Sequence, residues 1–353
     1  MNTNMKVLIL GAGRVFKHYL YILKKYKIKN YEIVAIVDKK KIDKSIINLK
    51  KIYFRSLKEA LNKTKPDLAI ILTPSGLHYK HSKYFLKKGI NVLCEKPLAL
   101  LPNQIIELGK LANKKKLLYD VVFQNRFNHS LNFAKKLILK KKLGKIITFS
   151  VRVFWCRFSN YYKDGWHGTW AMDGGVLSQQ AIHHLDAINW LIGPIFKTFS
   201  LKKRMLNKLE AEDTISCLLE TSNGTIGTFQ ATTAARPSDK VAEITLVGEK
   251  GYLSIGGVAL NMIDDIEIKG LTNKEISRIK KKNNQKVING YGFSHAIVLD
   301  KTFKNLKQKK ISPLVGFKNA SYTQQIIQTI YKSTENKTFY KVQLKNKSKL
   351  GRK

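Results

Sequence analysis

Short apolar runs alternate with longer amphipathic stretches over the first third of the chain. The runs at 6–10, 32–37, 68–72, 90–94 and 117–123 have the length and composition of buried strands. The stretches between them follow helical spacing, most clearly after the first run and at 79–88. Strands that alternate with helices predict a parallel, doubly wound α/β sheet of the Rossmann type.

Punctuating residues support the helices of this first region. Ser56 and Glu59 have capping-box spacing at a helix start. Gly89 suits the left-handed position after a helix, and Pro102 suits the first turn of the next one. These signals place the helices between the predicted strands.

The pattern changes after residue 127. A helical stretch at 131–143 precedes a long strand-like segment at 146–155, an aromatic loop at 158–170 and a helix at 176–192. Strand-like runs then follow one another without helices between them, which predicts an α+β domain with a large open, mostly antiparallel sheet. These runs are 213–220, 225–233, 242–247 and 251–255, and helices at 294–306 and 320–332 follow them. We therefore expect a cofactor domain at 1–127, a substrate and oligomerisation domain at 128–340, and a solvated basic tail at 341–353.

The chain has 353 residues and a formal charge of +41, carried mainly by lysine. Lysines occur in every segment rather than in one block, which is typical of a lysine-rich surface. The alternative is electrostatic capture of an anionic ligand or of nucleic acid. No helix-turn-helix or zinc-finger spacing accompanies the charge, so nucleic-acid binding is disfavoured.

The cysteines are Cys94, Cys156 and Cys217, an odd number without a Cys-x-x-Cys pair. This argues against a disulfide framework and favours a reducing cytoplasm. No apolar run approaches the length of a membrane span, and the amino terminus lacks a signal peptide's apolar stretch. We expect a cytoplasmic protein that does not cross a membrane.

A glycine turn follows the first predicted strand and opens a helix. Gly11 and Gly13 would let the backbone approach a pyrophosphate at the helix amino terminus. Phe16 stands where a third glycine is common. Asp38 ends the second strand, where a carboxylate binds an adenosine ribose and repels a 2′-phosphate. The turn predicts NAD as the cofactor, with NADP disfavoured, although the lysines after Asp38 soften that preference.

Lys96 lies between Glu95 and Pro97 at the carboxyl end of a predicted strand. Open α/β sheets bind their ligands at that edge. An ammonium there could stabilise the alkoxide that develops as hydride leaves an alcohol, or accept its proton. A surface charge is the alternative interpretation.

A second polar cluster follows helical spacing near the middle of the chain. Gln179, His183, Asp186 and Trp190 would share one helix face, and such a face can line a pocket for a polyhydroxylated ligand. His183 would carry protons there. His184 points elsewhere on the helix, and the two histidines without further ligands do not predict a metal site.

These motifs resemble those of the Gfo/Idh/MocA oxidoreductases over nearly the whole chain. The resemblance implies a Rossmann domain, a second α/β domain whose open sheet forms a homodimer or homotetramer interface, and catalytic roles for Lys96 and His183 beside the nicotinamide. It also implies a set of cofactor-binding residues: Gly11, Gly13, Arg14, Val15, Asp38, Thr73, Pro74, His78, Glu95, Lys96 and Gln124.

The segment from the aromatic loop through His183 is similar to a narrower group, the UDP-N-acetyl-2-amino-2-deoxyglucuronate dehydrogenases, which oxidise a sugar 3-hydroxyl for surface polysaccharides. Gln179 departs from the aspartate common in inositol-type members, which leaves Lys96 as the favoured proton acceptor. The predicted sugar-binding residues are Arg126, Arg157, Tyr161, Trp166, Thr169, Gln179 and His183. Two alternatives stay open: a dehydrogenase of a free polyol or monosaccharide, and a sensor or nucleic-acid-binding protein without turnover.

Overall fold

The computed structural model describes residues 4–41, 43–287 and 290–352. The chain forms two compact units, each built from two separate segments. The first unit contains Met1–Val122 and His295–Ser321, and the second contains Phe123–Ser294 and Tyr322–Lys353. The sequence-based boundaries differ because they do not return 295–321 to the first unit.

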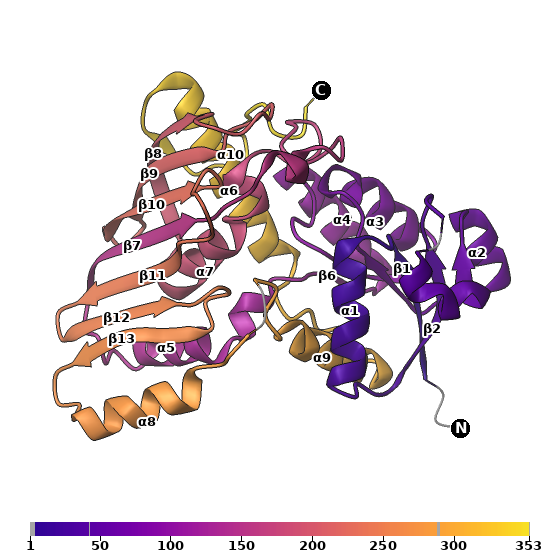
Figure 1. The fold of residues 1–353 in the computed structure, drawn as a ribbon, viewed down its shortest axis with the longest axis horizontal. Coiled ribbons are helices and arrows are strands. Elements are labelled where there is room, and N and C mark those ends of the chain that lie inside the picture. The colour runs from indigo at the N-terminus through magenta and orange to yellow at the C-terminus, as the bar shows by residue number, and fades with distance from the viewer. Residues whose placement is uncertain (1–3, 42, 288–289, 353) are drawn as a thin grey trace. The chain divides into compact units, whose positions relative to one another are not determined.

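The first unit is built on a six-stranded sheet with the order β3-β2-β1-β4-β5-β6, in which every neighbouring pair is parallel. This confirms the predicted doubly wound sheet (Figure 1). The chain reverses its direction of winding between β1 and β4, which is where such sheets bind ligands. The strands are β1 (Met5–Leu10), β2 (Tyr31–Val37), β3 (Tyr53–Phe54), β4 (Leu68–Ile71), β5 (Asn91–Cys94) and β6 (Tyr119–Val121).

The local signals place most helices of this unit correctly. The Ser56 hydroxyl accepts the Glu59 N–H at the start of α2, and Gly89 has a φ of +79° after α3. Pro102 opens α4, which ends at Lys116 in the left-handed conformation. The helices are α1 (Arg14–Lys25), α2 (Leu57–Lys63), α3 (His78–Lys87), α4 (Pro102–Lys115) and α9 (His295–Lys307), with 3-10 turns η1 (Lys44–Ile52) and η2 (Ser75–Leu77).

The segment 295–321 completes the first unit from a distant part of the chain. Its helix α9 packs against α1 and β1. The buried Asp120 carboxylate accepts the backbone N–H groups of Leu314 and Gly316 at 2.5 and 2.8 Å. Burial raises the pKa of Asp120, whereas these N–H donors lower it by stabilising the carboxylate. The hydrogen bonds anchor the returning segment to β6, the edge strand of the parallel sheet.

The second unit is built on an eight-stranded sheet with the order β13-β12-β11-β7-β10-β9-β8-β14. Among the described neighbouring pairs of this sheet, only β10 and β7 run parallel, so the predicted mostly antiparallel sheet is confirmed. The sequence reading missed β8, β13 and β14. The strands are β7 (Ile146–Phe154), β8 (Ile195–Lys203), β9 (Thr214–Thr221), β10 (Ile226–Thr232), β11 (Val241–Gly248), β12 (Gly251–Gly256), β13 (Met262–Ile268) and β14 (Tyr340–Lys341).

Helices cover one face of this sheet. α7 packs against β7 and β11, and Figure 1 shows α6, α7 and α10 on the far side of the strands. Leu201, Leu218 and Ile226 point away from the covered face and are each more than half exposed. The helices are α5 (His129–Leu139), α6 (Val176–Gln179), α7 (Ile182–Ile192), α8 (Asn273–Asn283) and α10 (Phe317–Asn336), with 3-10 turns η3 (Gln124–Phe127) and η4 (Ser159–Tyr162).

Two sequence expectations for this unit are wrong. The helix expected at 176–192 is two helices, because the Ala181 N–H reaches back five residues to Val176 O and widens the turn between them. The end of the chain is not a solvated tail, since Asn346, Ser348 and Leu350 are buried. Asn346 donates to Thr329, which supplies the polar partner that burial requires.

Candidate active site

The glycine turn between β1 and α1 has the geometry of a phosphate cradle. Gly11 has a φ of +103°, and a Cβ there would lie 2.8 Å from Leu72 O, so only glycine fits. A Cβ at Gly13 would meet nothing within 4 Å, which leaves open space at the amino terminus of α1. Arg14 and Val15 open that helix, and Phe16 is fully buried behind it. The missing third glycine therefore leaves the turn itself intact, and the cradle fits the pyrophosphate of a dinucleotide.

Asp38 follows β2 and turns its carboxylate toward the glycine turn. One oxygen accepts the Ala12 N–H at 2.7 Å, and the other accepts the Lys40 N–H at 2.9 Å. The carboxylate thus lies beside the backbone that would hold a pyrophosphate. This position suits hydrogen bonds from an adenosine ribose and is unfavourable for a 2′-phosphate.

Glu95 is a buried carboxylate at the end of β5. The Tyr19 O–H donates to it at 2.8 Å, the Lys96 backbone N–H donates at 3.2 Å, and His295 Nε2 lies 3.5 Å away. Burial alone would raise the pKa of Glu95, but His295 and Tyr19 bring it down to about 2. Glu95 therefore carries a negative charge that fixes the backbone of Lys96.

Thr73 and Pro74 follow β4, on the strand next to β5. The ring of His78 lies between this turn and the one after Lys96, with Nδ1 2.6 Å from Pro97 O and Nε2 2.7 Å from Thr73 O. The Thr73 hydroxyl contacts His81 at 3.0 Å. The predicted cofactor residues of the first unit thus gather at the carboxyl ends of β1, β2, β4 and β5.

In the second unit, His183 and His184 begin α7 but have different surroundings. His183 is half-buried, with the Phe123 ring edge-on at 6.2 Å. His184 is fully buried against Trp155, and burial lowers its pKa to about 3. Of the two, only His183 keeps access to solvent or a ligand. His184 is an interior residue, and its two ring nitrogens have no hydrogen-bond partner in the described part of the chain.

The polar helix face predicted around His183 serves partly as support. Asp186 forms a buried two-pronged ion pair with Arg126, with both N···O distances at 2.7 Å. The Thr323 hydroxyl also donates to Asp186, and the Arg126 guanidinium lies over the Trp190 ring. Arg126 therefore braces this unit, and its contact with a sugar stays a prediction.

Gln179 and Gln124 are buried amide side chains in the same unit, with exposed fractions of 8% and 3%. The Gln124 Oε1 atom has no hydrogen-bond partner in the described part of the chain. A buried acceptor of this kind suits a donor from a bound molecule. The roles predicted for both residues stay predictions.

The aromatic loop is held by carboxylates. Asp164 accepts the N–H groups of Trp166 and His167 and also contacts the His167 ring, which stacks on Trp166. Tyr161 packs edge-on against Tyr162, and its hydroxyl accepts from Gln180 at 3.3 Å. Burial raises the pKa of Tyr161, so it stays a neutral phenol. The loop presents stacked aromatic rings on a rigid frame.

Two other residues predicted to bind sugar shape this loop. The Thr169 hydroxyl donates to Trp166 O at 2.9 Å. The Arg157 guanidinium donates to Cys156 O at 2.7 Å and to Asp239 at 3.0 Å, and it lies over the Trp155 ring. Both have structural partners, and their contacts with substrate stay predictions.

The sequence reading missed the buried carboxyl of Glu212. It accepts the Tyr331 O–H at 2.8 Å and the Leu177 N–H at 3.2 Å. A Cβ at Gly175 would lie 2.3 Å from the Glu212 carboxyl carbon, which explains the glycine there. Burial raises the pKa of Glu212 to about 7. A motif search does not find Glu212, because it lies far along the chain from Gly175 and no local pattern links the two residues.

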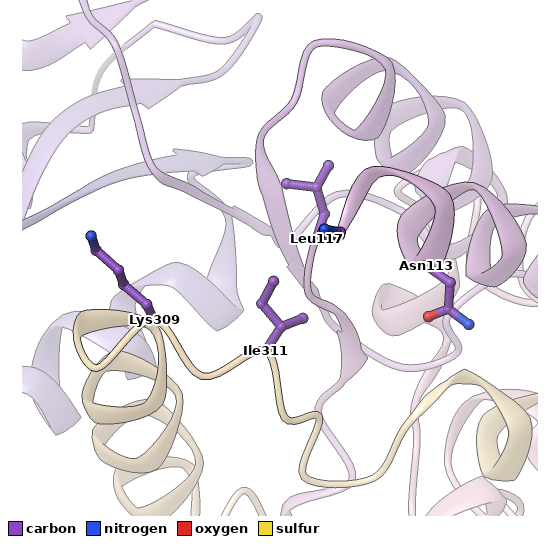
Figure 2. Close-up of a pocket in the computed structure, with 5 residues that line it drawn as sticks. Asn113, Leu117, Lys309 and Ile311 are labelled. Carbon is purple, nitrogen blue, oxygen red and sulfur yellow. The ribbon is translucent and has the colours of Figure 1, made fainter.

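Two surface hollows lie away from these residues. One, of about 360 Å³, is lined by Asn113, Leu117, Lys309 and Ile311 (Figure 2). Leu117 directly precedes β6, so this hollow lies at the amino end of that strand, whereas Lys96 follows the carboxyl end of the neighbouring parallel strand β5. Another, of about 620 Å³, lies on the exposed sheet face of the second unit beside Arg236. Neither contains a residue predicted to bind cofactor or sugar.

Three further observations concern the chain as far as the structure describes it. No cluster of three metal-ligating side chains occurs there. None of its helices combines the length and apolarity that crossing a bilayer requires. Cys94, Cys156 and Cys217 are all free thiols.

Comparison with known sequences agrees with this geometry. Residues 5–123 match the oxidoreductase family's NAD-binding Rossmann fold, and 135–344 match the C-terminal alpha/beta domain of the same family. The chain belongs to this Gfo/Idh/MocA family of oxidoreductases and carries its NAD-binding domain. The predicted family, enzyme class and cofactor are thereby confirmed.

Two curated dehydrogenases and one solved dehydrogenase structure are similar to this chain. The structure is similar to that of the WlbA dehydrogenase from Bordetella pertussis in complex with NADH and UDP-GlcNAcA, with a TM-score of 0.87, 27% identity and coverage of 97% of this chain and 98% of that one. The sequence is 29% identical to D-glucoside 3-dehydrogenase of Escherichia coli K12 over 54% of each chain. It is 24% identical to glucose-6-phosphate 3-dehydrogenase of Bacillus subtilis 168 over 61% of each chain. The chain thus spans little more than half the length of these two curated relatives.

Proposed function

We propose that this oxidoreductase oxidises a ring hydroxyl of a nucleotide sugar such as a UDP-N-acetylhexosaminuronate, in the biosynthesis of surface polysaccharide. The observation that carries the proposal is the likeness, over nearly the full length of both chains, to a dehydrogenase solved with NADH and UDP-GlcNAcA. Two relatives whose names specify a 3-dehydrogenase support carbon 3 as the reacting position.

The cofactor half of the proposal rests on the first unit. Gly11 and Gly13 would hold the pyrophosphate, and Asp38 would bind the adenosine ribose. Thr73, Pro74 and Glu95 would border the nicotinamide end. NAD, when bound, supplies the hydride acceptor for the oxidation.

Lys96 and His183 would act on the same sugar hydroxyl. The ammonium of Lys96 would donate a hydrogen bond to the developing alkoxide, and its neutral form could take the proton. His183 would carry that proton onward, because its imidazole is only partly buried and imidazole is the usual proton carrier among side chains. Gln179 cannot act as a base, which favours Lys96 as the acceptor.

The aromatic loop would bind the sugar nucleotide. Tyr161 and Trp166 offer ring faces, and the neutral phenol of Tyr161 can donate a hydrogen bond to a sugar oxygen. Arg157 would supply positive charge toward a diphosphate or carboxylate, as would Arg126 if its ion pair opens. Thr169 would contribute a backbone or hydroxyl contact.

The enzyme would work as a homodimer or homotetramer in the cytoplasm. The exposed sheet face of the second unit, with Leu201, Leu218 and Ile226, is the surface we propose for self-association. Free thiols at all three cysteines support a reducing compartment.

A free glycoside or monosaccharide is the second candidate substrate, because the match to D-glucoside 3-dehydrogenase favours it. The distinguishing experiment incubates purified protein and NAD with UDP-GlcNAcA, UDP-glucuronate, methyl glucoside and myo-inositol. Products are then reduced with borodeuteride, so that deuterium marks the oxidised carbon. Deuterium at carbon 3 of a UDP-sugar supports the proposal, and turnover of free sugars alone contradicts it.

Variants test the assigned roles. Lys96→Met should lower kcat by about 100-fold to 10,000-fold, as expected when an acid–base group is lost. Lys114→Met is the matched control, because that lysine is exposed on α4. Salt-sensitive RNA binding, together with no detectable oxidation of any of these sugars by the wild type or by Lys96→Met, would instead favour a non-catalytic protein.

A further inference from the structure

His78 makes two hydrogen-bond contacts that no single neutral imidazole can satisfy. Its Nδ1 lies 2.6 Å from Pro97 O, and its Nε2 lies 2.7 Å from Thr73 O. A neutral imidazole has one N–H donor and one unprotonated nitrogen, whereas a carbonyl oxygen only accepts. In the neutral ring, one nitrogen lone pair would face an oxygen lone pair at this short distance.

The doubly protonated ring resolves this conflict. An imidazolium donates from both nitrogens, and contacts of 2.6 and 2.7 Å have the short lengths of charge-assisted hydrogen bonds. Both acceptors are backbone atoms at the ends of neighbouring parallel strands, so a cation between them would tie two turns together. One of those turns carries Thr73 and the other carries Lys96.

The charges around His78 oppose one another. Burial is the largest influence and lowers the pKa of His78, and Lys96 acts in the same direction. The two carbonyl acceptors and the Glu95 carboxylate raise it. His81 faces the same turn, and His78 opens α3, whose positive end also disfavours a cation. Burial favours the neutral ring, whereas the two short contacts favour the cation, because the neutral ring would leave one carbonyl oxygen facing a nitrogen lone pair.

We propose that His78 is a positioning residue that, as a buried imidazolium, clamps the Thr73 turn to the Lys96–Pro97 turn and so holds the Lys96 backbone at the cofactor edge. This inference rests on the proposed function only for the role of Lys96. The clamp itself concerns protons and backbone atoms of the first unit.

The direct test counts the protons on the ring. Nitrogen-15 spectra of the uniformly labelled wild-type protein at pH 7 should contain the signal of a doubly protonated imidazole that belongs to His78. The signal should vanish in His78→Gln and stay in His129→Gln, which changes an exposed histidine. A neutral tautomer at His78 under these conditions overturns the proposal. The measurement needs no substrate, so it stands even if the proposed sugar is wrong.

A kinetic test addresses positioning. Glutamine can donate to one carbonyl but not span both, so His78→Gln should lower kcat by on the order of 100-fold through misplacement of Lys96, with KM for the sugar within about twofold. His129→Gln should match the wild type in both. An unchanged kcat in folded His78→Gln, verified by its circular dichroism and melting temperature, would contradict a positioning role.

Discussion

The Arg126–Asp186 ion pair gives the sharpest stability prediction. Both side chains are nearly inaccessible to water, with exposed fractions of 7% and 2%. Asp186→Asn keeps the shape but removes the charge, leaving a buried guanidinium without its counter-ion. Loss of one partner of a buried pair costs about 3–5 kcal/mol. The Asn oxygen can still accept one N–H, so we expect the lower end, about 3 kcal/mol.

The assay is urea unfolding followed by tryptophan fluorescence. All four tryptophans lie in the second unit, and the Trp190 ring contacts the Arg126 guanidinium, so the signal reports unfolding of this unit. For a unit of this size, about 3 kcal/mol corresponds to a loss of about 6–12 °C in melting temperature.

A matched surface pair provides the control. Arg152 and Glu243 form a 3.0 Å ion pair on the exposed sheet face, with Arg152 46% exposed. Glu243→Gln should cost less than about 1 kcal/mol. If Asp186→Asn costs no more than Glu243→Gln, the buried pair is solvated or dispensable, and our account of Arg126 as a brace is wrong.

Three further predictions follow from single residues. Gly11→Ala should cost about 1–3 kcal/mol of backbone strain and weaken NAD binding by at least about tenfold, measured by calorimetric titration; equal affinity would contradict the cradle. The pKa of Glu212 is raised from 4.5 to about 7 in the folded state, so its contribution to stability is present below pH 4.5 and is lost as pH rises through 7. Between pH 4.5 and pH 8 the free energy of unfolding of the wild type should therefore fall by about 3 kcal/mol relative to that of Glu212→Gln, as measured by urea unfolding at the two pH values. Parallel pH curves would refute it. The pKa of His184 is lowered from 6.5 to about 3, so stability should fall as pH drops below 6.5, and His184→Phe should remove that acid sensitivity in thermal melts without lowering stability at pH 8.

Local patterns were enough to predict the parallel sheet and the cofactor turn. Apolar runs, the Gly89 stop and the Pro102 start mark element ends within the chain itself, and those ends agree with the structure to within a few residues. The glycine turn and Asp38 are likewise readable, because their roles depend on short stretches after β1 and β2.

Long-range partners could not be read in the same way. Tyr19 and His295 both reach Glu95, yet no spacing rule links them to it. The turn between α6 and α7 widens through one backbone hydrogen bond, which leaves no trace in apolar periodicity. The polar composition at the end of the chain predicts a solvated tail, because the sequence does not show that Ser348 bonds to the distant Gln328. Such pairings depend on tertiary packing rather than on local composition.

The returning segment 295–321 has a consequence for synthesis of the protein. A ribosome that has released residues 1–122 has made every strand of the parallel sheet but not α9, nor the backbone amides that bind Asp120. The dinucleotide-binding unit therefore stays incomplete until the ribosome has translated residues 123–294 and the segment 295–321. A fragment cut before His295 would lack its final helix, so we expect it to be recovered as an aggregate or a chaperone client rather than as an autonomous domain.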